Sequence, residues 1–238
     1  EQNFKRFLVY NILGDVLGTN STSGPLGFRM KFFFVTWYNL LRPGALTCPL
    51  VPGVRAVRQP WQCVGYVIFL GLLVRALRAP QIGFGELAPC AGVLAILTPF
   101  DFVTFQACRG EHYGYMLVCC VLAPWQHALT GCQLVQLALW FFAGTAKVGP
   151  WFVYVMCFMM PNSIVLRFTN AVGLLRYRHL FVNLPTDVNP KALVRALAKF
   201  GCYTELVLSL LCATLPVVGV PTTISFHIYI LSMMPFAS

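Results

Sequence analysis

Long apolar runs alternate along this chain of 238 residues with short segments that hold most of the arginine, lysine and proline. A hydrophobic stretch of about 20 residues is long enough to cross a bilayer as an α-helix. The pattern therefore predicts about six to eight crossings or half-crossings of a membrane. The apolar runs are 7–18, 61–77, 87–105, 113–123, 129–146, 151–168, 202–220 and 222–236.

Residues at the ends of the runs support this interpretation. Trp61 opens the run 61–77, and Arg75 and Arg78 close it, as expected for an interfacial aromatic residue and for cations that reach the headgroups. Glycine and proline predict turns at 148–150 and 218–221.

The segments between the runs differ in character. The run 7–18 is too short to cross alone. Residues 19–27 are predicted to form a loop, 28–41 an interfacial segment, and 42–60 a basic, proline-rich connector. Pro99 is expected to break the run 87–105, and a second break is expected at 161–162.

The segment 166–199 is the longest polar stretch after the connector and is strongly basic. Asn189 is a candidate helix cap, with Pro190 at the first helical position. Lys191, Arg195 and Lys199 recur every four residues opposite leucine and valine, which predicts an amphipathic helix on a membrane surface. A solvated basic face is the alternative. The basic residues place this extramembrane segment on the cytoplasmic or equivalent side.

Composition gives the same answer. Hydrophobic residues make up 58% of the chain and charged residues 10%, whereas soluble domains carry about 25% charged residues. The net charge of +10 is spread over the ends of apolar runs, which suits anionic lipid and excludes a nucleic-acid surface. We expect an all-α, multi-pass transmembrane bundle with an interfacial helix, forming a single membrane domain over 1–238 that is truncated at both ends.

The ten cysteines lie mostly within apolar runs and form no CxxC pair. Cysteine in such surroundings behaves as a small hydrophobic residue, so free, buried thiols are expected rather than disulfides. The spacing predicts no metal site.

Charged residues inside the runs are the first candidates for function. Lys147 ends one run, Glu205 lies one turn into another, and Asp101 follows Pro99. An intramembrane carboxylate is a functional candidate by default. We expect Glu205 to have a basic partner such as Lys147 or a loop arginine, and Asp101 to cap a broken helix. Lys147 can equally serve as an interfacial anchor. No spacing predicts a catalytic constellation.

Three histidines in or beside apolar runs, His112, His127 and His227, are candidate cofactor ligands. A neutral imidazole can bind the iron of haem or the magnesium of a chlorophyll. It can equally donate a hydrogen bond between helices, so packing is the alternative for each residue. Chlorophyll, carotenoid and lipid are the candidate ligands, because twenty phenylalanines suit such contacts as well as plain packing.

The segment 141–162 reads FFAGTAKVGPWFVYVMCFMMPN. It resembles an uncharacterised transmembrane family that is described only as a domain of unknown function and is typified by mycobacterial multi-pass proteins. The resemblance departs after Met160, where the family pattern reads Ser-Asn-Asn-Pro. Gly144, Lys147 and Trp151 are more distantly similar to membrane proteins related to vitamin K-dependent carboxylase. Further similar stretches are Gly24-Pro25-Leu26, Leu41-Arg42-Pro43-Gly44, Arg109-Gly110-Glu111 and Phe226-His227.

The scattered polar groups favour a non-catalytic integral membrane subunit or scaffold of a larger membrane complex. A pigment- or lipid-binding accessory subunit of a photosynthetic or respiratory supercomplex is one version of this hypothesis. The alternative is a membrane enzyme or transporter acting on a lipid-soluble substrate. The expected partners are membrane lipids and other membrane protein subunits, and the thylakoid, inner and plasma membranes are the candidate locations.

Overall fold

The computed structural model describes residues 1–17, 41–159 and 189–233. This part of the chain is mostly helical and contains no strand, and Leu46 and Val57 form an isolated antiparallel bridge. The all-α membrane class predicted from the sequence is confirmed. The predicted loop at 19–27, the interfacial segment up to residue 40, the break at 161–162 and residues 166–188 of the basic segment lie outside the described residues.

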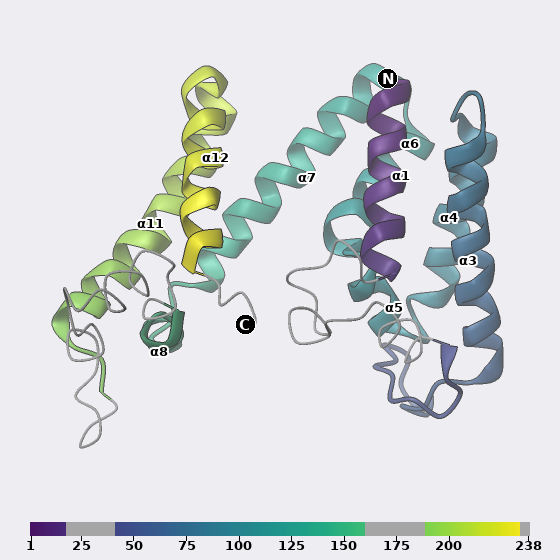
Figure 1. Cartoon of the computed structure of the whole chain (residues 1–238), viewed down its shortest axis with the longest axis horizontal. Helices are drawn as coiled ribbons and strands as arrows, with labels where there is room; N and C mark the ends of the chain where they lie inside the picture. Colours follow the sequence, from purple (N-terminus) through teal and green to yellow (C-terminus); the bar gives the residue numbers. More distant parts are fainter. Residues whose placement is uncertain (18–40, 160–188, 234–238) are drawn as a thin grey trace, which may run out of the picture. The chain divides into compact units, whose positions relative to one another are not determined.

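The chain forms two compact units, Glu1–Val135 and Gln136–Ser238 (Figure 1). The helix α7 begins in the first unit and ends in the second. Among the described residues, the helices of the first unit before α7 are α1 (Gln2–Leu17), α3 (Pro60–Arg78), α4 (Phe84–Leu97), α5 (Phe102–Ala107), the π-helical turn η1 (Gly110–Gly114) and α6 (Tyr115–Leu122). The other helices that the structure describes are α7 (Trp125–Ala146), α8 (Trp151–Met159), α11 (Ala192–Thr214) and α12 (Pro216–Met233).

Within the described part of the chain, three helices are long and apolar enough to cross a membrane: α3, α7 and α11. They coincide with the predicted runs 61–77 and 129–146 and with most of 202–220. At about 1.5 Å per residue, α3 is about 28 Å long, close to the ~30 Å hydrocarbon thickness of a bilayer. The helices α4 and α12 are apolar but shorter. The predicted run 87–105 divides between α4 and α5, because Pro99 lies in the link between them.

The first unit is built around α1, which packs on α3, while α3 packs on α4 and α4 on α6. The short apolar run at 7–18 therefore becomes a core helix of this unit. Its Leu8 and Ile12 are buried, as are Phe69 and Leu73 of α3. The Tyr66 hydroxyl donates to the carbonyl oxygen of Val16 at 3.0 Å, which satisfies a polar group inside this apolar core.

The connector before α3 is irregular, as predicted, but it is held in place by backbone hydrogen bonds. Amide groups of Gly44 and Thr47 donate to carbonyls of 56–58. The amides of Leu50 and Val51 both donate to the Pro99 carbonyl, at 2.8 and 3.3 Å. These bonds fasten the connector to the link between α4 and α5.

In the second unit, α11 and α12 form a tight helical hairpin, and α8 packs on α11. The predicted turn at 218–221 is wrong, because α11 ends at Thr214 and α12 begins at Pro216. Proline is well suited to the first position of a helix, where its missing N–H is not needed. Gly219 lies against the end of α11, where an added Cβ would be only 2.5 Å from the Cys212 amide nitrogen.

The amphipathic segment 190–199 differs from the expectation in two ways. It does not form a separate helix, because residues 192–199 are the first two turns of α11. The helix starts two residues later than predicted: Lys191, not Asn189, is the capping residue. The Arg195 amide donates to the Lys191 carbonyl and its side chain donates to the Pro190 carbonyl, so Pro190 stays outside the helix. Gly201 does not interrupt α11, since the helix continues through it to Thr214.

Candidate functional site

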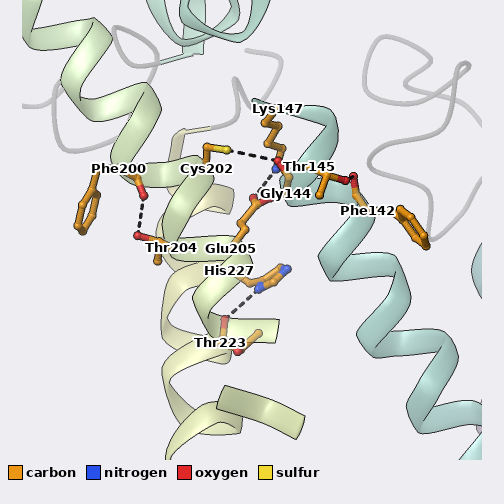
Figure 2. A network of polar contacts seen from close by, with 10 residues as sticks. All are labelled: Phe142, Gly144, Thr145, Lys147, Phe200, Cys202, Thr204, Glu205, Thr223 and His227. Atoms are coloured by element: carbon orange, nitrogen blue, oxygen red, sulfur yellow. Dashed lines mark hydrogen bonds and ion pairs between the residues drawn. The ribbon is translucent and has the colours of Figure 1, made fainter. Parts of the chain in front are cut away.

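The end of α7 and the middle of α11 bring two charged residues together in the second unit. Lys147, directly after α7, forms an ion pair with Glu205 of α11 (Figure 2). The predicted basic partner of Glu205 is thereby confirmed. The side chain of Glu205 is 11% exposed and that of Lys147 is 27% exposed. Each charge therefore needs the other, because an unpaired ion in an apolar environment is costly.

A close approach of the two helices positions this pair. An added Cβ at Gly144 would lie 2.9 Å from Leu206 Cδ2 and 3.4 Å from the Glu205 Cβ, so a larger residue would push α11 away. The Cys202 thiol donates to the Gly144 carbonyl at 3.3 Å (Figure 2). Small residues at helix crossings permit such contacts within a membrane.

The two charges differ in how completely they are satisfied. The Lys147 ammonium also lies 5.7 Å from the ring centroid of Phe152, a cation–π contact. The second carboxylate oxygen of Glu205, Oε2, is buried and has no hydrogen-bond partner among the described residues. Such an oxygen can accept a proton or a hydrogen bond from a ligand.

A small cavity of about 120 Å³ opens beside Lys147. Its charged residues are Lys147 and Lys199, and its remaining polar groups include the Cys202 thiol and Tyr203. The volume is below the ~300 Å³ at which sites for whole drug-sized ligands begin. It has room for a few water molecules or one small polar group. The other lining residues are Val148, Gly149, Pro150, Phe152, Val153 and Ala198.

His227 belongs to the same unit and lies on α12. Its Nδ1 is 2.9 Å from the Thr223 carbonyl oxygen (Figure 2), and its ring centroid is 5.7 Å from that of Trp140. A carbonyl oxygen only accepts, so in the neutral tautomer that fits this contact Nδ1 carries the proton and Nε2 has the free lone pair. Nε2 is therefore the atom that could ligate a pigment or haem metal. The packing alternative has equal support in the contact with Trp140.

Asp101 lies in the first unit, where its partner is Arg58 of the connector. Both side chains are almost fully buried, at 1% and 2% exposed. Arg58 Nη2 lies 2.6 Å and Nε 2.8 Å from the same oxygen, Asp101 Oδ2, and the Thr104 hydroxyl donates to it at 3.1 Å. Asp101 occupies the position before α5 that was predicted for a cap, but its side chain makes no capping bond. It ties the connector to α5 instead.

A second ion pair of the first unit was not foreseen from the sequence. Asp15 of α1 is buried and lies 3.3 Å from Nε of Arg109. Arg109 precedes the π-helical turn and has a left-handed backbone, with φ of +50°. Such backbone is costly for a residue other than glycine. The only feature of the sequence that drew attention to Arg109 was the similarity of Arg109-Gly110-Glu111 to the transmembrane family.

The other candidate histidines are also in the first unit. His112 lies in η1 with its ring 4.3 Å from that of Tyr113. His127 is exposed in the first turn of α7. Their role as cofactor ligands stays a prediction, as does that of His227. Within the described ranges no group of three or more histidine, cysteine or acidic residues is placed to hold a metal ion. All ten cysteines are free, as predicted, and seven of them are buried.

Comparison with known proteins places the chain in a family. The family described as "Transmembrane protein of unknown function (DUF3556)" matches residues 2–238. No curated protein and no solved structure matches the chain. The match covers nearly the whole sequence and agrees with the three helices long enough to cross a membrane. The chain therefore belongs to the DUF3556 family of transmembrane proteins.

Proposed function

We propose that the protein is a non-catalytic integral membrane subunit that packs against other membrane proteins through α11. The main evidence for this role is a stripe of exposed apolar residues on α11, formed by Phe200, Tyr203, Val207 and Leu210. The spacing of three, four and three residues places them on one face, as in helices that pack together. Large exposed apolar faces are typical of surfaces that contact lipid or another protein.

The burial of the spans supports this proposal. In the structure, 33% of the most apolar window of α3 is buried, 17% of that of α7 and 22% of that of α11. Most of the surface of each span is therefore available to lipid and partner helices. The charged residues also support the proposal, because they form separate ion pairs rather than a shared constellation. Lys147–Glu205 lies in the second unit, and Arg58–Asp101 and Arg109–Asp15 lie in the first.

The proposal includes pigment or lipid as a bound component, with His227 Nε2 as the candidate ligand atom. A purified chain that carries chlorophyll or haem absorbance, lost in His227→Phe, supports that part. An unchanged absorbance in the variant assigns the pigment elsewhere. The thylakoid, inner and plasma membranes are the membranes in which to seek the complex.

The test is photo-crosslinking in native membranes. A photoreactive phenylalanine analogue replaces Val207 or Leu210 on the stripe, and buried Leu208 on the same helix is the matched control. We expect discrete higher-mass protein adducts from the two stripe positions and none from Leu208. Adducts with lipid alone at both stripe positions, together with a single-chain mass in native-lipid nanodiscs, would overturn the proposal.

A second candidate is an enzyme or transporter that acts on a lipid-soluble substrate. It is favoured by the unbonded Oε2 of Glu205 in the ion pair beside the cavity at Lys147. The distant resemblance to carboxylase-related membrane proteins falls on this same segment. Extracts of the purified chain and of Lys147→Met are compared by lipid mass spectrometry. Specific loss of one lipid-soluble molecule in the variant supports this candidate, and identical extracts refute it.

A further inference from the structure

A groove in the first unit has the chemistry of a phospholipid site. Its volume is about 630 Å³, and it lies where α3 ends and α4 begins. Two guanidinium groups, from Arg75 and Arg78, line it together with one carboxylate, from Glu86. The charged lining is therefore net positive. The remaining lining residues are Gly71, Val74, Ala79 and Gly85.

The two arginines are available to a ligand. Arginines at the end of a span commonly complement the carbonyls of the last helical turn. Here Arg6 of α1 does so: its guanidinium donates to the Leu77 carbonyl at 3.4 Å and to the carbonyls of Ala79 and Pro80 at 2.8 Å each. The cation that α3 needs at its C-terminus is thus supplied from another helix.

One hydrogen bond orients the Arg75 guanidinium and leaves its other N–H groups available to a ligand. Its Nη2 donates to the Gly85 carbonyl at 3.1 Å across the groove. Arg78 is exposed, and its guanidinium forms no hydrogen bond or ion pair with the described residues. Glu86 is engaged elsewhere, because its Oε2 accepts from the Gly83 amide at 2.9 Å. The groove therefore offers unused donors that match a phosphate oxygen in geometry and charge.

An apolar track leads from the bilayer into this groove. Val64, Val67, Ile68 and Val74 are exposed on α3, and with Gly71 they follow one face of the helix up to the two arginines. The rise from Val64 to Val74 is about 15 Å, half of the ~30 Å hydrocarbon thickness. An acyl chain of one leaflet can lie along this face while its phosphate reaches the arginines.

We propose that this groove binds an anionic phospholipid, with the phosphate held by Arg75 and Arg78 and an acyl chain along the exposed face of α3. The net positive lining selects an anionic headgroup over a zwitterionic one. The groove is open over Gly71 and Gly85, since an added Cβ at either position would meet no atom within 4 Å. This site is independent of the function proposed for α11.

The experiment measures lipid retained by the whole chain. The protein is reconstituted in phosphatidylcholine nanodiscs with a minor fraction of phosphatidylglycerol, and retained lipid is counted by native mass spectrometry. We expect selective retention of phosphatidylglycerol, reduced about thirty-fold in Arg75→Gln/Arg78→Gln because each arginine contributes about 1 kcal/mol at an anionic surface. Arg42→Gln/Arg55→Gln, which removes two exposed arginines from the connector, is the charge-matched control.

A second pair of variants tests the groove without changing charge. Gly71→Leu fills it, while Gly92→Leu adds the same side chain at an exposed, open position of α4 that does not line it. We expect only Gly71→Leu to lose phosphatidylglycerol. If the double arginine variant does not fold, this pair of glycine variants still tests whether the groove binds phosphatidylglycerol.

Three results would overturn the proposal. The first is equal loss in the groove and connector arginine variants, which indicates general surface charge. The second is unchanged retention in Gly71→Leu. The third is release of phosphatidylglycerol by millimolar inorganic phosphate, which assigns the groove to free phosphate rather than to a lipid.

Discussion

Separating Arg58 from Asp101 tests how the connector is held to the first unit. Asp101→Leu leaves the Arg58 guanidinium buried without its carboxylate, and the Thr104 hydroxyl loses its acceptor. Both charged side chains are at most 2% exposed, so water cannot replace the lost partner without opening the connector. Breaking a buried pair in this way costs about 3–5 kcal/mol.

Replacing both partners has a different expected result. Arg58→Met/Asp101→Leu removes the two charges together and keeps apolar volume in their place. Such replacements are often neutral, because the desolvation of both ions disappears with their attraction. We expect the double variant to lie within about 1.5 kcal/mol of the parent protein, a tolerance typical of well-fitting apolar substitutions. The double variant is therefore expected to be more stable than Asp101→Leu alone.

The assay is thermal unfolding in nanodiscs with a fluorogenic maleimide. Seven of the ten free thiols are buried and become accessible to the maleimide only when the protein unfolds, so the rise in fluorescence reports unfolding. At about 2–4 °C for each kcal/mol, we expect Asp101→Leu to lower Tm by roughly 10 °C. Glu111→Gln, which removes an exposed carboxylate from the same unit, is the control and should change little. A single variant that matches this control, or a double variant as unstable as the single one, would refute the reasoning.

Three further predictions concern the second unit and the connector. Lys147→Met leaves the mostly buried Glu205 carboxylate unpaired and should lower the unfolding free energy by about 2–4 kcal/mol. Lys147→Met/Glu205→Met should recover most of this lost free energy in a double-mutant cycle, and additive losses would show that the pair is uncoupled. Gly219→Ala should destabilise the α11–α12 hairpin by about 1–3 kcal/mol, because its Cβ would collide with the backbone at the end of α11. The control Gly201→Ala places its Cβ where it meets nothing within 4 Å and should be neutral or stabilising, so equal Tm values for the two variants would contradict this prediction. A membrane-impermeant maleimide should label Cys48, the exposed thiol of the connector, in the folded protein before any other, and mass-mapped labelling of a different thiol first would be inconsistent with the structure.

The hydrophobic pattern by itself determined that the chain enters a membrane and where two of its spans lie. Runs of apolar residues bounded by Trp61, Arg75 and Arg78 place α3 to within a residue or so at each end. This works because the bilayer acts on each segment separately, through length and local hydropathy. The thiol state of the cysteines and the need of Glu205 for a cation follow equally from local surroundings.

Helix ends within apolar sequence were decided by packing rather than by composition. The sequence places a turn at 218–221 and a separate surface helix at 190–199, whereas α11 runs unbroken from Ala192 to Thr214 and turns at Leu215. Glycine and proline permit a turn without requiring one. The backbone contact of Gly219 with the end of α11 forms in this hairpin and has no counterpart in a local pattern.

Only the tertiary structure decided which charges meet. Arg58 and Asp101 are 43 residues apart, and Lys147 and Glu205 are 58 apart. Asp15 acquires Arg109 as its partner in the same way. The sequence shows that each buried carboxylate must be neutralised or paired, since an isolated ion is costly in an apolar environment. It does not show which cation does so, because that depends on how helices distant in sequence pack and on which connector folds back onto them.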